Sequence, residues 1–344
     1  MRYENHASCF LPCHGKQSSY VMKTNIALVG CGSWGKNLAR NLFNLGVLSM
    51  VCDADPKILD WLRKIYNVKI TTSYADLISN PDIKGIIIAT PTHTHYSLAR
   101  LALLAGKHVY VEKPLARGYL QAQELNHLAG VKGLTLMVGH LLVYHPAVNC
   151  LRELIFKGEL GEIRFLNSDR RNFNQQQRRD NNVIWDLAPH DISMMSYILG
   201  LEPVEIESAF GWSTNNDSII DVAHLDLNFP GDIPAHIHNS WIDPQKQVLL
   251  TVNGSKKTAV LNDSRLENKL ELYFIDDDGV VQKEIPSFSN DEPLKLECEH
   301  FIHCIGSREA PRSDGTSGYQ VVKILEEAEQ KMHIANRAQL LKFV

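Results

Sequence analysis

The sequence predicts an α/β protein in two parts: a doubly wound parallel sheet, followed by an α+β domain whose open sheet is mostly antiparallel. Two patterns lead to this prediction. Between residues 25 and 140, short apolar runs alternate with stretches of helical spacing, whereas after residue 150 several segments alternate apolar and polar residues. The length of 344 residues also exceeds the usual size of a single hydrophobic core, which favours two domains.

The first part is expected to contain buried parallel strands. Its apolar runs are continuous, which indicates strands that are covered on both faces. These runs lie at residues 26–30, 49–55, 84–90, 107–113 and 135–140. Helical spacing predicts helices at 35–46, 56–66 and 95–106, and Gly46 and Gly106 are expected to end two of them. Repeated strand–helix units of this kind form a doubly wound sheet.

The second part has the alternation of a half-exposed sheet. The clearest example lies at 221–229, where one face would carry Ala223, Leu225, Leu227 and Phe229. Further strands are expected at 235–242, 246–252 and 269–279, and helices at 148–158, 190–200 and 318–333. We expect a first domain at 23–142 and a second at 143–344. Residues 1–22 lack the apolar segment of a secretion signal and are expected to form a flexible tail.

Composition excludes several classes of partner. The chain carries 35 basic and 39 acidic residues, a net charge of −4, which provides no basic surface for nucleic acid and no membrane-seeking tail. No apolar run approaches the roughly 20 residues needed to span a bilayer. The seven cysteines lack the paired spacing of a metal site, which favours reduced thiols in a cytoplasmic protein and predicts no bound metal.

A glycine-rich turn follows the first predicted strand and opens the first predicted helix. Gly30, Gly32 and Gly35 give the pattern G-x-G-x-x-G, and Ser33 and Trp34 fill the turn. The first glycine permits the tight turn, the second lets the backbone approach a pyrophosphate, and the third lets helix and strand pack closely. The strand–turn–helix context therefore predicts a Rossmann domain that binds a dinucleotide.

The second predicted strand ends at Asp53, at the usual distance for a carboxylate that accepts both ribose hydroxyls. The same charge would repel a 2′-phosphate, so NAD is favoured over NADP, although Lys57 lies close enough to weaken that preference. Either Asp53 or Asp55 could instead cap the helix that begins at Pro56, and Asp55 fits that role better.

Lys113 follows a buried strand and precedes Pro114. A lysine at the carboxyl end of a parallel strand points into the crevice where such sheets bind ligands. Its ammonium could stabilise alkoxide character on a substrate oxygen while hydride departs. The alternative is an ordinary solvated lysine at a strand end.

Asp186 and His190 are four residues apart, so on a helix they share one face. His190 could act as general base on a hydroxyl group, and Asp186 could orient the imidazole. Pro189 suggests a helix start, so the alternative is that Asp186 only caps the helix and Asp191 only favours its dipole.

Several of these segments resemble the glucose–fructose oxidoreductase / inositol 2-dehydrogenase (Gfo/Idh/MocA) family. The resemblance rests on GCGSWG, ATPTHTHY, EKPLA and the D-x-x-x-H pattern, and it covers roughly residues 24–335. It implies that Lys113, Asp186 and His190 are catalytic. It also implies that the cofactor-contacting loops contain Thr90, Pro91, His95 and Glu112, and that the open sheet of the second domain forms a homodimer or homotetramer.

Residues 139–148 and 185–200 are similar to a branch of that family that acts on nucleotide-activated sugars, the UDP-N-acetylglucosamine 3-dehydrogenases. Tyr144 and His145 would then face the substrate, as would Arg170, Arg171 and Asn172. An arginine pair suits a diphosphate through bidentate hydrogen bonds. The alternative for both arginines is an exposed polar loop, which is the preferred interpretation for Arg178 and Arg179.

Together these expectations predict an NAD-dependent oxidoreductase that removes hydride from a secondary hydroxyl of a sugar. The expected position is C3 of a nucleotide-linked amino sugar, which would be used for surface glycans such as lipopolysaccharide. Two alternatives within the family are a 3-ketosugar reductase and an inositol or glucose dehydrogenase. A non-catalytic NAD(H)-binding regulator is an alternative of another class. His236 and His238 lack a third metal ligand and are expected to be polar sheet-face or oligomer residues.

Overall fold

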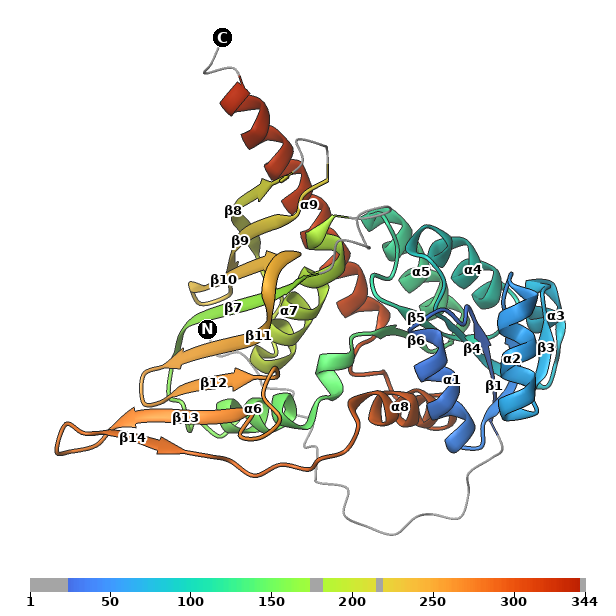
Figure 1. The fold of residues 1–344 in the computed structure, drawn as a ribbon, viewed down its shortest axis with the longest axis horizontal. Helices are drawn as coiled ribbons and strands as arrows, with labels where there is room; N and C mark the ends of the chain where they lie inside the picture. Colours follow the sequence, from blue (N-terminus) through green and yellow to red (C-terminus); the bar gives the residue numbers. More distant parts are fainter. Residues whose placement is uncertain (1–23, 174–181, 215–218, 341–344) are drawn as a thin grey trace.

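The computed structural model describes residues 24–173, 182–214 and 219–340. The expected tail at 1–22 and the arginines at 178 and 179 lie outside this part of the chain. Two sheets organise the molecule, one in each lobe (Figure 1). The fold is α/β, as predicted.

The first sheet has six strands, all parallel, in the order β3-β2-β1-β4-β5-β6. Its strands are β1 (Asn25–Val29), β2 (Leu48–Cys52), β3 (Lys69–Thr71), β4 (Ile83–Ile88), β5 (His108–Glu112) and β6 (Leu136–Gly139). The order reverses between β1 and β4, and a parallel sheet of this kind binds its ligand at the carboxyl ends of the strands beside that point. The short β3 was not expected, because three residues carry no readable periodicity.

Helices cover both faces of this sheet: α1 (Gly35–Asn44), α2 (Pro56–Tyr66), α3 (Tyr74–Ser79), α4 (Thr92–Leu104) and α5 (Tyr119–Lys132). Gly46 and Gly106, just after α1 and α4, have φ angles of 72° and 77°. Left-handed backbone at these positions stops each helix at little cost because glycine has no Cβ. The predicted helix ends are therefore confirmed.

The second sheet has eight strands in the order β14-β13-β12-β11-β7-β10-β9-β8. They are β7 (Ile163–Phe173), β8 (Glu205–Trp212), β9 (Val222–Phe229), β10 (Ile233–Ser240), β11 (Ile242–Gly254), β12 (Thr258–Asn262), β13 (Leu270–Ile275) and β14 (Val281–Glu284). Only β7 and β10 pair in parallel. The predicted inward face of β9 is buried, which confirms the mostly antiparallel, half-covered sheet.

The inner face of this sheet packs against α6 (Pro146–Phe156) and α7 (Val183–Leu199). A 3₁₀ helix, η1 (Leu141–Tyr144), leads from β6 into α6. Expected strand 235–242 is divided, because β10 ends at Ser240 and β11 begins at Ile242, with the buried Trp241 at the corner.

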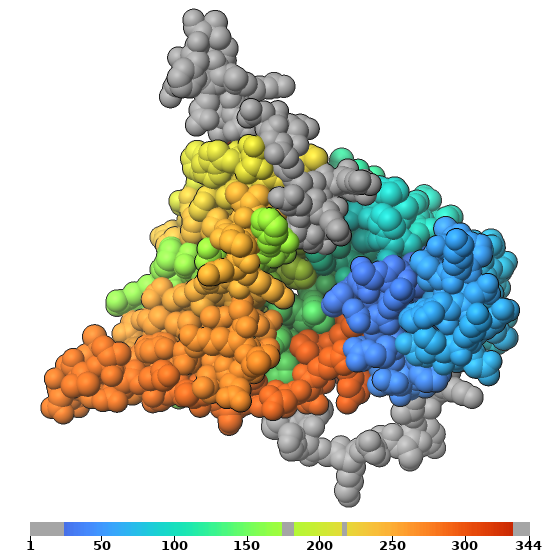
Figure 2. All heavy atoms as spheres, in the orientation of Figure 1, coloured from blue at the N-terminus to red at the C-terminus, as the bar shows by residue number. Residues whose placement is uncertain are grey.

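The end of the chain joins the two lobes. Helix α8 (Pro293–Ser307) packs on α1 and η1, and α9 (Gly315–Leu340) contacts α5 in the first lobe as well as α7 and β8 in the second. Figure 1 shows α9, in red, running from the first sheet along the second. Figure 2 shows the same arrangement with all heavy atoms as spheres, the orange second sheet on the left and the blue start of the first lobe on the right. No helix in the described ranges is long and apolar enough to cross a membrane.

Candidate active site

The glycine turn after β1 is shaped for a ligand that approaches the backbone. Gly30 has φ 84°, and a Cβ there would lie 2.6 Å from the carbonyl oxygen of Ala89. A Cβ at Gly35 would lie 2.1 Å from the carbonyl oxygen of Gly30, whereas one at Gly32 would meet nothing within 4 Å. The outer two glycines therefore allow the turn itself. The space beside Gly32 stays open for a pyrophosphate at the start of α1.

A cleft of about 520 Å³ lies beside this turn, and its walls come from the glycine turn, the end of β2 and the loop after β4. Asp53 lines it. Its Oδ2 accepts a hydrogen bond from the backbone N–H of Cys31 (2.6 Å), and its Oδ1 accepts one from the N–H of Asp55 (2.9 Å). Asp55 caps α2 by accepting from the N–H of Lys57, as preferred from the sequence. Asp53 is thus anchored where it can accept from ribose hydroxyls, so these residues fit NAD.

Trp34 links the glycine turn to the end of β5. Its indole Nε1 donates to Glu112 Oε1 at 2.6 Å, and the hydroxyl of Tyr110 donates to the same oxygen at 3.1 Å. Burial raises the pKa of Glu112. Glu112 therefore lies beside the glycine turn, where both partners set its position, and its contact with the cofactor stays a prediction.

The loop after β4 completes the cleft with Thr90 and Pro91, and Ser33 contributes from the glycine turn. His95 is placed differently. It is buried, with Nδ1 2.8 Å from the carbonyl oxygen of Pro114 and Nε2 2.8 Å from that of Thr90. Its ring joins two loops of the site and is not among the residues that line the cleft.

Lys113 and Asp186 are brought into direct contact from 73 residues apart. The Lys113 Nζ donates to the Asp186 carbonyl oxygen at 2.7 Å and to its Oδ1 at 3.0 Å. The indole of Trp241 donates to the other carboxylate oxygen, Oδ2, at 3.1 Å. About one-fifth of each charged side chain is exposed, so Lys113 is not simply a solvated lysine at a strand end.

Helix α7 positions Asp186 and His190. Its N-cap is Asn182, whose side chain accepts from the N–H groups of Ile184 and Trp185. The alternative that Asp186 caps the helix is therefore wrong. Pro189 lies inside the helix and has no N–H, so the carbonyl of Trp185 loses its normal partner. The next carbonyl, that of Asp186, accepts from Lys113.

His190 lies one turn beyond Asp186. Its Nδ1 is buried and has no hydrogen-bond partner among the described residues. Burial lowers its pKa well below the ordinary value, and the charges of Lys113 and Arg170 lower it further. The imidazole is therefore neutral at neutral pH and can accept a proton. Lys113 supplies a positive hydrogen-bond donor nearby, which suits an oxygen that gains negative charge.

Arg170 and Arg171 point to opposite faces of the second sheet, because successive side chains of a strand alternate. Arg170 faces α7, where its Nε donates to Asp191 at 2.9 Å. Asp191 is fully buried and also accepts from Ser168 (2.8 Å) and Asn239 (3.0 Å). Asp191 thus ties α7 to the sheet and orients Arg170, which is more than the dipole effect considered from the sequence.

Arg171 lies on the outer face, where it pairs with Asp169 (2.9 Å) and Asp243 (3.2 Å). The expectation of an arginine pair that binds one diphosphate is wrong for this reason. Both residues lie in β7, so the exposed-loop alternative does not apply to them either. Asn172 has a buried Oδ1 that lacks a partner in the described ranges.

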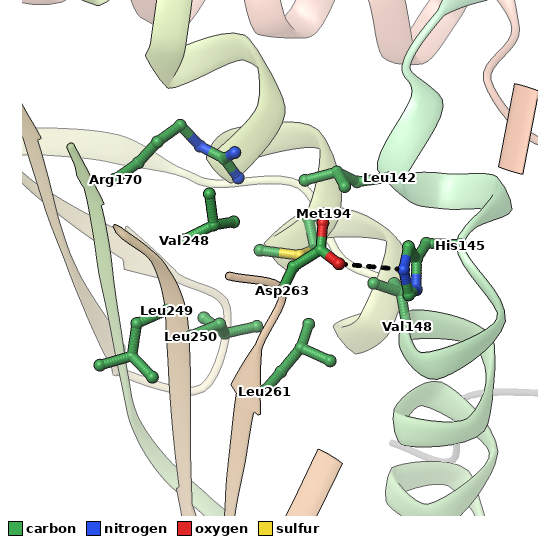
Figure 3. Close-up of a pocket in the computed structure, with 10 residues that line it drawn as sticks. All are labelled: Leu142, His145, Val148, Arg170, Met194, Val248, Leu249, Leu250, Leu261 and Asp263. Carbon is green, nitrogen blue, oxygen red and sulfur yellow. Dashed lines mark ion pairs between the residues drawn. The ribbon is translucent and has the colours of Figure 1, made fainter. Parts of the chain in front are cut away.

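Tyr144 and His145 are both buried and do not face a site that could hold a sugar. Residues 141–144 form η1, which turns Tyr144 into the core against α8, where its hydroxyl lies 3.2 Å from Ser313 Oγ. His145 caps α6 and pairs through Nε2 with Asp263 Oδ1 at 3.2 Å (Figure 3). The pocket drawn there holds about 10 Å³, which is room for about one water molecule and not for a sugar.

Three residues of the site were missed in the sequence: His140, Asp191 and Trp241. His140 follows β6 as Lys113 follows β5, and that shared position at a strand end was the clue available. Asp191 was considered only for the helix dipole. Nothing in the sequence identified Trp241 as a partner of Asp186, because the two are 55 residues apart.

Known protein families and proteins resemble this chain over most of its length. Residues 24–140 match a family model described as the oxidoreductase family with an NAD-binding Rossmann fold, and residues 148–260 match the GFO/IDH/MocA C-terminal domain. Oxidoreductase YrbE of Bacillus subtilis is 27% identical over 326 residues, covering 89% of this chain and 93% of its own.

UDP-N-acetylglucosamine 3-dehydrogenase of Acidithiobacillus ferrooxidans is 25% identical over 306 residues, covering 88% of this chain and 94% of its own. A crystal structure of that enzyme superposes with a TM-score of 0.79 at 22% identity, covering 90% of this chain and 98% of the other. At 22% identity the superposition shows a shared fold alone. With both domain models matched, the chain belongs to the Gfo/Idh/MocA family of NAD-binding oxidoreductases.

Proposed function

We propose that this protein is an NAD-dependent dehydrogenase that oxidises a secondary hydroxyl of a sugar, at C3 of a nucleotide-activated amino sugar such as UDP-N-acetylglucosamine. The observation that carries the proposal is the contact of Lys113 with Asp186 beside a neutral His190. A proton acceptor and a cationic donor close to each other suit the oxidation of an alcohol.

In this proposal His190 removes the hydroxyl proton, and it is ready to do so because its depressed pKa keeps it neutral. Lys113 donates a hydrogen bond to the same oxygen and stabilises its developing charge. Asp186 holds the ammonium of Lys113 in place, and Trp241 holds Asp186. Bound NAD would supply the hydride acceptor, held by the glycine turn and Asp53.

The substrate class rests on one line of support. A relative that aligns with most of this chain is named UDP-N-acetylglucosamine 3-dehydrogenase. Arg170 adds no independent support, because it is paired with the buried Asp191 and lines the pocket of about 10 Å³. A product oxidised at C3 could then receive an amino group for a surface glycan.

The experiment is incubation of the purified protein with NAD and UDP-N-acetylglucosamine, followed at the absorbance band of reduced nicotinamide. Growth of that band with the wild type and not with Lys113→Met supports the proposal. Turnover of myo-inositol or glucose in its place would reject the nucleotide-sugar assignment. Binding of NAD without turnover of any of these sugars would favour a regulatory protein.

We propose further that two copies of the chain associate through the outer face of the second sheet, as a homodimer or as half of a homotetramer in the cytoplasm. Support comes from large apolar side chains on that face, each at least 36% exposed: Phe165, Phe173, Phe210, Trp212 and Ile242. His224, His236 and His238 stack between them, and the described residues contain no metal-binding cluster. Phe173→Asp should convert the assembly to monomers in light scattering, whereas a wild-type monomer would contradict this.

A further inference from the structure

A second imidazole, that of His140, lies at the carboxyl edge of the first sheet. Strands β5 and β6 pair in parallel, with Glu112 opposite Gly139. The residues that follow them, Lys113 and His140, therefore leave the sheet side by side. His140 is 1% exposed, so its imidazole is buried at this edge of the sheet.

Neither ring nitrogen of His140 has a hydrogen-bond partner in the part of the chain that the structure describes. Two other buried histidines have partners on both ring nitrogens: His95 joins two carbonyl groups, and His145 joins a backbone N–H and a carboxylate. A buried polar group without a partner costs stability, so such a group calls for an explanation. A ligand group that bonds to one of these nitrogens would provide one.

The charge state of His140 limits which chemical groups of a ligand can bond to its ring nitrogens. Burial, together with the positive charge of Lys113, lowers the pKa of His140 to about 3. The neutral imidazole offers one donor and one acceptor. A phosphate or carboxylate can only accept, so it can bond only to the ring nitrogen that carries hydrogen. A hydroxyl group both donates and accepts, so it can bond to whichever ring nitrogen it reaches, in either tautomer.

We propose that His140 is a substrate-contacting residue that hydrogen-bonds to a hydroxyl group beside the reacting one. This rests on the proposed function, because the reacting oxygen is assigned to Lys113 and His190. The side-by-side exit of residues 113 and 140 from the sheet places His140 at the neighbouring position on the sugar ring. His140 thus helps to select the substrate and does not itself take the proton.

The test compares His140→Leu, which removes both polar atoms, with His140→Asn, which keeps a donor and an acceptor. With UDP-N-acetylglucosamine, we expect kcat/KM to fall about 10- to 100-fold for the leucine variant and less for the asparagine variant. The Kd of NAD should stay within about 2-fold, and the Tm of His140→Leu should equal or exceed that of the wild type, because an unpaired buried group is gone. If the His140→Leu variant does not fold, His140→Met provides the same apolar change with a more adaptable side chain.

A matched control is His108→Leu, at the opposite end of β5, where the imidazole accepts from the N–H of Thr135. It should lower the Tm and leave kcat/KM unchanged. An apolar variant at His140 as active as the asparagine variant, or more so, would overturn the proposal. Absence of wild-type turnover would reject the sugar nucleotide instead. His140 would then be judged by thermal shift with NAD and myo-inositol or glucose, where a shift kept in His140→Leu would also overturn it.

Discussion

The two halves of the site hold their ligands by different means. The cofactor half is centred on one strand–turn–helix unit, whose backbone N–H groups and missing Cβ atoms shape an open cleft, and the end of β2 at Asp53 and the loop after β4 complete its walls. The catalytic half is assembled from the end of β5, the middle of α7 and the corner at Trp241. Its groups are largely buried, and burial shifts the pKa values of His140 and His190.

This difference has a practical consequence. In the cofactor half, cofactor binding depends on the space that the backbone leaves. A single methyl group added at a glycine of the turn should therefore weaken cofactor binding, whereas most side chains there can vary. In the catalytic half, the identity of each polar side chain matters, because a lost partner leaves another buried group unsatisfied. Changes in the two halves should therefore separate cofactor affinity from the rate of the chemical step.

The largest effect is expected from Lys113→Met, which keeps the volume of the side chain and removes its charge. We expect kcat to fall by about 10³-fold, because the developing alkoxide loses its cationic donor, while the Kd of NAD changes little. Steady-state kinetics and NAD titration measure both quantities. Lys132→Ala, at the exposed end of α5, is the control and should behave as the wild type. A kcat retained within about 10-fold in Lys113→Met would show that the donor lies elsewhere.

The cofactor half is tested by a pair of glycine variants. Gly32→Ala meets no protein atom within 4 Å, so its Tm should stay unchanged while the Kd of NAD rises about 10- to 100-fold through a clash with the pyrophosphate. Gly35→Ala would place a methyl group 2.1 Å from a carbonyl oxygen, so it should lower the Tm as well. Equal NAD affinity in Gly32→Ala and the wild type would contradict the assigned pyrophosphate position.

A smaller effect is expected from Trp241→Phe, which removes the hydrogen bond to Asp186 and keeps the aromatic packing. One such bond contributes about 1 kcal/mol, so we expect kcat to fall about 3- to 10-fold with little change in KM. A positioning role predicts this split, whereas a purely structural role would lower the Tm and leave kcat per folded molecule intact. Kinetics and thermal denaturation of the same preparation distinguish the two.

The last prediction is that kcat/KM changes little between about pH 8 and about pH 6. A general base acts in its neutral form, so activity is lost only as the pH falls through its pKa. Burial and neighbouring charges hold the pKa of His190 well below 6.5. We therefore expect kcat/KM to stay nearly constant from about pH 8 to about pH 6, where an unshifted histidine would already have lost more than half of it. A half-loss near pH 6.5 would contradict a buried, neutral His190.

Local sequence patterns were sufficient for the cofactor half, because its chemistry lies in one short stretch around Gly30 and in the end of β2 at Asp53. They also indicated Lys113, Asp186 and His190 as separate positions. They could not establish which face of β7 carries Arg170, nor that η1 turns Tyr144 into the core. Those facts depend on strand register and on packing between distant segments. The same holds for the neighbouring exits of Lys113 and His140.

The most direct test follows the hydrogen itself. UDP-N-acetylglucosamine carrying deuterium at C3 is mixed with NAD and an equal amount of enzyme, the protein is denatured, and the total cofactor is examined by mass spectrometry. The account predicts deuterium on the nicotinamide ring with the wild type, and transfer about 10³-fold slower with Lys113→Met over the same reaction time. Formation of product without deuterium in the cofactor would contradict hydride transfer at this site.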